Sequence, residues 1–171
     1  PPSTAATLNL AAVAAQCARV FRGFDRAFAG RCLTAAEAAW TAALAHPAVY
    51  ARNNFTGGGP YDDDDVSDEF YWAAAELFVT TGRPQYYRFI KSSPHFLEVP
   101  GTVEANGVVM GGAIGWRTTQ ALGTISLALV PSRLPWWQVA QARRNIVRIA
   151  DGYATAAALE PYGLPYASST G

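Results

Sequence analysis

Six helical segments, alternately apolar on all sides and amphipathic, constrain the fold of this chain more than any other feature. Apolar residues recur at helical spacing over 3–21, 25–46, 66–81, 84–92, 118–130 and 135–158. The first, third and fifth segments are apolar nearly all round, which predicts buried helices. The second, fourth and sixth each carry one polar face, which predicts helices that cover the buried ones.

The order of these helices predicts an all-α fold. Short connections make neighbouring helices antiparallel, so the simplest arrangement is a curved array of helical hairpins with the buried helices inside. Such an array closed on itself is an α/α barrel, and six helices make about half of a twelve-helix barrel. The glycine-rich segments 57–59 and 101–115 are expected to be long loops, which are often functional.

The array has a geometric consequence for the loops. All inner helices run in one direction, because each is separated from the next by one outer helix and two connections. The loops that precede them, 1–3, 57–68 and 110–117, should therefore meet at one rim of the array. We expect any binding site of this chain to lie at that rim.

Composition narrows the classes of partner. Thirteen basic and thirteen acidic residues balance, so we expect no nucleic-acid partner. No apolar run reaches the roughly 18 residues of a membrane span, so we expect no membrane partner. The start of the chain shows neither an initiator Met nor a signal peptide, which suggests an internal piece of a larger protein. Cys17 and Cys32 fit no metal spacing and read as small buried hydrophobic residues rather than a disulfide.

The start of the third helix is the candidate site. The segment 61–77, Y-D-D-D-D-V-S-D-E-F-Y-W-A-A-A-E-L, joins acids and aromatic rings to a buried helix. Carboxylates are favoured there by the helix dipole, and the combination suits the floor of a sugar-binding cleft. We expect no cofactor. Calcium stays open, because hard cations bind clustered carboxylates, although the glycine and distant glutamate of an EF-hand loop are missing.

Three segments resemble glycoside hydrolase family 9, which includes many secreted cellulases. They are P-P-S-T-A-A-T-L-N-L-A-A at 1–12, the acidic segment above, and the segment 116–130, which contains A-L-G-T-I-S-L-A-L-V. The resemblance implies an (α/α)6 barrel, of which residues 1–171 would be the middle part. It also implies an extracellular endoglucanase that hydrolyses β-1,4-glucan chains, such as cellulose, with inversion.

The resemblance implies substrate contacts but no catalytic residue. Trp116 matches a tryptophan that stacks on a glucosyl ring, although Arg117 and Thr118 replace the usual Gly-Ser after it. Inversion needs one carboxylic acid and one carboxylate base, and neither the D-A-G-D motif of the base nor the late glutamate of the acid occurs here. We therefore expect the chain alone to be inactive. The substrate-binding residues implied are Tyr61, Asp64, Asp65, Asp68 and Trp116.

Other readings stay open. The chain could be a non-catalytic helical-hairpin module for carbohydrate binding or packing, or part of another (α/α)6 polysaccharide-degrading enzyme. Asp68 and Glu69 could equally serve the helix dipole and cap. Trp136 and Trp137 are expected to pack within a hairpin. His46 and His95 show no recognisable partner in the sequence.

Overall fold

The computed structural model describes residues 3–51, 63–104, 106–107, 109–110, 114–115 and 117–164. All six predicted helices are present there, and each ends within two residues of its expected limit. In chain order they are α1 (Thr4–Phe21), α2 (Arg26–Ala45), α3 (Ser67–Thr81), α4 (Pro84–Ser92), α5 (Gln120–Leu129) and α6 (Trp136–Leu159).

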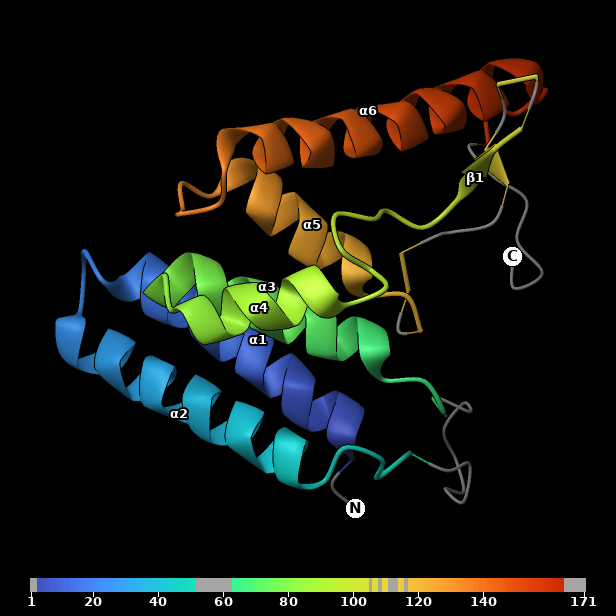
Figure 1. The fold of residues 1–171 in the computed structure, drawn as a ribbon. Helices are drawn as coiled ribbons and strands as arrows, with labels where there is room; N and C mark the ends of the chain where they lie inside the picture. Colours follow the sequence, from blue (N-terminus) through green and yellow to red (C-terminus); the bar gives the residue numbers. More distant parts are fainter. Residues whose placement is uncertain are drawn as a thin grey trace.

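The helices form the predicted array of hairpins. In the inner row α3 packs between α1 and α5, while α2 covers α1, α4 covers α3 and α6 covers α5. Figure 1 shows that α1, α3 and α5 begin at the same end of the array. The all-α fold class and the common direction of the inner helices are therefore confirmed. Within the described residues, no helix is both long enough and apolar enough to cross a membrane.

Local signals fix the ends of the helices. The side chain of Ser3 accepts a hydrogen bond from the backbone of Ala6 at 3.3 Å and begins α1. Asp25 begins α2 in the same way, by accepting from the backbone of Phe28 at 2.8 Å. Gly82 ends α3 with a φ of 68°, the left-handed conformation that glycine adopts without strain.

The core lies around α3, where 12 of the 15 residues are buried. Between the inner row and the outer helices, Trp40 of α2 is the centre of an aromatic cluster. Its ring meets Phe70, Tyr86 and Phe89 edge-on at centroid distances of 5.7, 5.8 and 4.9 Å. These contacts join α2, α3 and α4 into one core, because edge-to-face pairs add to the burial of apolar surface.

The segment 101–115 contains a short hairpin where the sequence predicts only a loop. Strands β1 (Thr102–Val103) and β2 (Val109–Met110) pair antiparallel and lie beside α6 (Figure 1). Gly107 has a φ of 82° in the turn between them. Two-residue strands are too short to show an alternating pattern, so periodicity could not reveal them.

Two expectations about burial are wrong. α1 is not buried on every side, because Leu10, Val13 and Val20 expose 51, 47 and 60% of their surface. Trp136 and Trp137 do not pack into the hairpin, since they expose 77 and 56% and meet each other edge-on. Periodicity identifies an apolar face, but it does not show whether another element covers that face.

Candidate functional site

In the segment that leads into α3, two aspartates each accept a hydrogen bond from the backbone two residues further along the chain. Asp63 forms an isolated antiparallel bridge with Ala51, and its Oδ1 accepts a hydrogen bond from the backbone of Asp65 at 3.2 Å. Oδ1 of Asp65 in turn accepts from the backbone of Ser67, the first residue of α3, at 2.9 Å. The bond from the Ser67 backbone lowers the pKa of Asp65, which therefore stays ionised.

Asp68 joins the starts of two inner helices. Its carboxylate is buried, and Oδ2 accepts hydrogen bonds from the backbone N–H of Thr119 at 2.6 Å and from its hydroxyl at 3.0 Å. Thr119 is the residue that precedes α5. Asp68 thus caps a neighbouring helix rather than its own, and it fixes the start of α3 beside the start of α5.

Glu69 is the most perturbed acid of the site. It is buried, and its Oε2 has no hydrogen-bond partner among the described residues. Burial, a hydrogen bond with Asp68 and the negative charge of Asp68 together raise the pKa of Glu69 to about 9. Burial and the charge of Asp68 also raise the pKa of Asp63. Glu69 is therefore protonated at neutral pH in the absence of a bound cation.

Sequence reasoning missed one pair at this end of α3. The hydroxyl of Ser67 and Nε2 of His95 lie 2.9 Å apart. The sequence alone shows no partner for His95, and the structure supplies one. His95 lies 28 positions from Ser67 in the sequence and outside any helix, so no spacing could have paired them.

The structure brings together the predicted acids that it describes. Asp64 and Asp65 are exposed at the start of α3, where carboxylates can accept hydrogen bonds from sugar hydroxyls. Asp68 lies one turn further into the helix, is buried, and is hydrogen-bonded to Thr119. Tyr61 and Trp116 lie outside the described residues. What the site offers a ligand is therefore two exposed acids above a buried acidic pair.

The buried pair does not have the geometry of an inverting catalytic pair. Asp68 and Glu69 are neighbours at the start of α3, and both side chains are buried. An acid and base that invert a glycosidic bond must stand roughly 6.5–9.5 Å apart, to leave room for the attacking water. Both acids are buried and Asp68 is hydrogen-bonded to Thr119, so they are not placed as an accessible acid and base.

The chemistry of the acids suits a hard cation in part. Asp63 and Glu69 each present one carboxylate oxygen without a hydrogen-bond partner in the described part of the chain. Calcium prefers such oxygens. However, no group of three or more His, Cys, Asp or Glu side chains among the described residues is placed to hold a metal.

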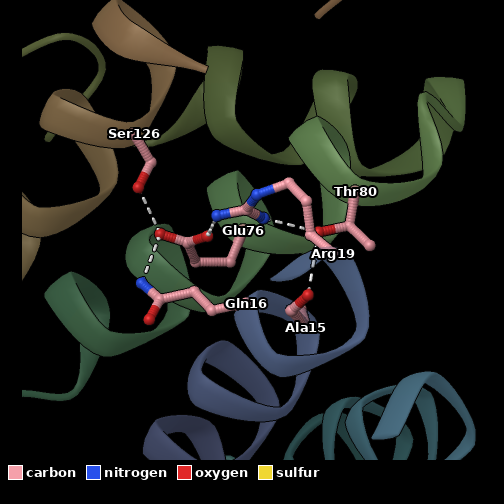
Figure 2. Close-up of polar contacts among 6 residues, drawn as sticks. All are labelled: Ala15, Gln16, Arg19, Glu76, Thr80 and Ser126. Carbon is pink, nitrogen blue, oxygen red and sulfur yellow. Dashed lines mark hydrogen bonds and ion pairs between the residues drawn. The ribbon is translucent and has the colours of Figure 1, made fainter. Parts of the chain in front are cut away.

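A buried polar network holds the inner helices behind the site (Figure 2). Glu76 of α3 is fully buried and pairs with Arg19 of α1 at 2.9 Å. Its other oxygen accepts from Gln16 of α1 at 2.9 Å and from Ser126 of α5. Arg19 also donates to Thr80 at 2.7 Å. One carboxylate thereby contacts all three inner helices and fixes their mutual positions.

Two relatives resemble almost the whole chain. It is 49% identical to the Cellulose 1,4-beta-cellobiosidase of Acetivibrio thermocellus, over 96% of this chain and 20% of that protein. It is 42% identical to Endoglucanase C of Cellulomonas fimi, over 99% of this chain and 15% of that protein. The chain thus spans a fifth or less of the length of these relatives.

The fold agrees with the sequence comparison. The structure superposes on the crystal structure of a metagenome-derived glycoside hydrolase family 9 endoglucanase with a TM-score of 0.76 and 30% identity. That match covers 95% of this chain and 28% of the other. The family described as Glycosyl hydrolase family 9 matches residues 1–171. With the helical array and these relatives, the match shows that the chain belongs to glycosyl hydrolase family 9.

Proposed function

We propose that this chain is the middle part of the catalytic barrel of an inverting endo-β-1,4-glucanase. In this proposal residues 1–171 supply part of the wall of the substrate cleft, and the catalytic acid and base come from elsewhere in the protein. The substrate would be a β-1,4-glucan such as cellulose. Family membership supports the class of reaction. The exposed acids at the start of α3, and the lack of an accessible catalytic acid and base among the described residues there, support a role in substrate binding rather than in the chemical step.

One observation carries the proposal. The exposed acids Asp64 and Asp65 stand at the start of α3, and the Asp68–Thr119 bonds hold that start beside the start of α5. Acids before one inner helix and residues before the next can therefore act on one ligand. A glucan chain offers rows of hydroxyl groups, which match exposed carboxylates, and apolar ring faces, which match aromatic side chains.

The experiment measures glucan binding by the intact enzyme after Asp64→Asn and Asp65→Asn. Each change removes a charge and keeps the shape of the side chain. We expect the Kd for a soluble glucan oligosaccharide to be several-fold larger and the Tm to be unchanged. Asp25→Asn is the matched control, because Asp25 is an exposed aspartate that begins α2 at the opposite end of the array, where asparagine caps a helix equally well (Figure 1). If both test variants bind the oligosaccharide as tightly as the wild type, these acids do not contact the substrate.

Tyr61 and Trp116 complete the proposed wall. Trp116→Ala should weaken glucan binding by about 1–3 kcal/mol, the scale of losing one well-packed aromatic contact. The Tm should change little. If the substitution lowers the Tm and leaves binding intact, Trp116 belongs to the core. An intact protein that binds glucan but releases no reducing ends would favour the non-catalytic module instead.

We propose that the hydrolysis itself uses no cofactor and that any calcium is structural. Asp63 and Glu69 would each contribute the carboxylate oxygen that has no hydrogen-bond partner, the other ligands would come from elsewhere in the protein, and a divalent cation would displace the proton of Glu69. A chelator should then lower the Tm of the intact enzyme at pH about 8, and Glu69→Gln should abolish that effect. If neither chelator nor added calcium changes the Tm, Glu69 binds a proton and no calcium.

We also propose an extracellular location. Cellulose is an insoluble polymer that does not cross a membrane, so an enzyme that cuts it must meet it outside the cell. Fractionation of the producing cells, with activity measured in the medium, tests this proposal. Activity confined to the cell interior would contradict it.

A further inference from the structure

Cys17 of α1 and Cys32 of α2 face each other across the first hairpin. Their sulfur atoms lie 2.8 Å apart. Non-bonded carbon atoms ordinarily approach only to about 3.5–4.0 Å, so this contact is unusually close. Both residues are half-buried free thiols. The expectation that they are free and not disulfide-bonded agrees with the structure, whereas the expectation that they are buried is wrong, because both are half-buried.

The fold holds the two sulfurs together. α1 and α2 form a tightly packed antiparallel hairpin, so residues at similar distances from its turn lie opposite each other. At the same end, the rings of Phe21 and Phe28 meet edge-on with centroids 5.0 Å apart. Cys17 and Cys32 are the two cysteines of residues 1–171, so no other pairing is possible within this segment. The approach of the thiols thus results from helix packing and not from a mobile surface loop.

We propose that Cys17 and Cys32 are a redox modification site, and that they form an intrachain disulfide between α1 and α2 in an oxidising environment. The oxidant class is a small-molecule disulfide such as oxidised glutathione. One cysteine thiolate attacks a glutathione sulfur, forms a mixed disulfide and releases one glutathione. The second thiolate then attacks the bound cysteine sulfur, closes the Cys17–Cys32 bond and releases the other glutathione. The cysteines lose two protons and two electrons, and the glutathione disulfide gains them.

The bond should stabilise the fold. It would close a loop between residues 15 positions apart, which restricts the unfolded chain far more than the folded one. A loop of this size gives about 3 kcal/mol, and because the Tm shift per kcal/mol shrinks as a protein gets longer, the Tm of the intact enzyme should rise by on the order of a few °C. A hydrogen bond with Cys32 raises the pKa of the Cys17 thiol, so the exchange is best run at pH about 8.5.

The test uses the intact enzyme, treated with oxidised or reduced glutathione and then denatured with an alkylating agent present. We expect the oxidised sample to yield a peptide pair linked through Cys17 and Cys32 and the reduced sample to yield both cysteines alkylated. The Tm should be higher in the oxidised sample. Cys32→Ser and Cys17→Ser are the matched controls, and their Tm should be the same in both buffers.

Two outcomes would overturn the proposal. The first is complete alkylation of both cysteines after oxidation of the native protein. The second is a link that forms equally well in denaturant, since native packing would then contribute nothing. If a serine variant fails to fold, the comparison of oxidised and reduced wild-type protein still decides the question.

Discussion

Two buried glutamates on α3 have opposite surroundings. Glu76 faces the cation of Arg19 and two further hydrogen-bond donors, so its charge is compensated. Glu69 faces Asp68, another acid, and its pKa rises to about 9. The same residue type, seven positions apart on one helix, thus serves as an ion-pair partner in one place and as a protonated acid in the other.

Glu69→Gln should change how stability depends on pH. In metal-free buffer the folded protein keeps the Glu69 proton up to pH about 9, whereas the unfolded chain loses it near 4.5. The unfolded state therefore binds fewer protons in this window, so stability falls as pH rises, by up to about 1.4 kcal/mol per pH unit. Glu69→Gln should flatten this decline and be more stable than wild type at pH 8. Denaturant unfolding of the intact enzyme from pH 5 to 9 measures this dependence of stability on pH.

Glu104→Gln is the control, because Glu104 is an exposed acid. If the stability of all three proteins falls in parallel with pH, the raised pKa is wrongly assigned to Glu69.

Glu76→Ala should be strongly destabilising. Arg19 would be left partly buried without its partner, which typically costs about 3–5 kcal/mol. Glu37→Ala is the matched control, because Glu37 pairs with Arg83, whose side chain is 49% exposed. Such a surface pair contributes about 0–1 kcal/mol. Equal losses in the two variants, measured by denaturant unfolding of the intact enzyme, would contradict the structural role of the network.

At the scale of elements, α3 and α5 lie close together at Gly123. A Cβ atom added there would lie 3.1 Å from the Cα of Trp72, 3.1 Å from Cε1 of Tyr71 and 3.2 Å from the Cβ of Ala75. Tyr71 cannot move aside easily, because its hydroxyl is hydrogen-bonded to Leu97 and Thr124 at 2.9 Å each. The glycine is therefore required by helix packing, and not by an unusual backbone angle.

Gly123→Ala should destabilise the protein, although alanine favours a helix by about 1 kcal/mol over glycine. The overpacking against α3 typically costs about 1–3 kcal/mol and should exceed that gain. Gly30→Ala in α2 is the control, since nothing lies within 4 Å of its added Cβ. We expect Gly30→Ala to raise the Tm and Gly123→Ala to lower it. A higher Tm in both would show that α3 and α5 separate more readily than the structure implies.

The helices could be predicted from the sequence because their signals are local. Ser3, Asp25 and Gly82 mark helix ends within a few residues of the apolar patterns that they bound. The contacts between helices could not be predicted in this way. Leu97 has a φ of 59°, which no propensity suggests, and hydrogen bonds from its backbone to Tyr71 and from Asn145 to its carbonyl hold it. Such features depend on which helices pack together.

In the candidate site, too, local features could be predicted from the sequence and contacts between distant residues could not. The acids of 63–69 were identified from their position before a buried helix. That Asp68 would bond Thr119, and that Ser67 would meet His95, depends on residues 51 and 28 positions away. The placement of Tyr61 and Trp116 rests on the family resemblance and stays a prediction.

At the scale of the whole molecule, the array ends in apolar surface on both sides. Leu10, Val13 and Val20 are exposed on α1, and Trp136 and Trp137 are exposed at the start of α6. Large exposed apolar patches favour association. We expect the 171-residue chain expressed by itself to aggregate or to be marginally stable. Gel filtration and thermal unfolding check this, and a sharp monomer peak with cooperative melting would show that the array is self-sufficient.

The chain by itself should also lack glucanase activity. The sequence holds no assignable acid and base, and Asp68 and Glu69 are buried, with Asp68 hydrogen-bonded to Thr119. Purified chain incubated with carboxymethyl cellulose should release no more reducing ends than a heat-treated sample. Turnover above that background, lost in Glu69→Gln, would instead place catalysis at the start of α3.

The cap that Asp68 provides to α5 affects the order in which this molecule can assemble. The first turn of α5 is completed by a carboxylate 51 positions earlier in the chain, on a helix that forms its own separate hairpin. A segment of ten residues gains little from its own hydrogen bonds in water. We therefore expect α5 to be mostly unfolded until α3 packs against it, so that α5 depends on α3 for its stability.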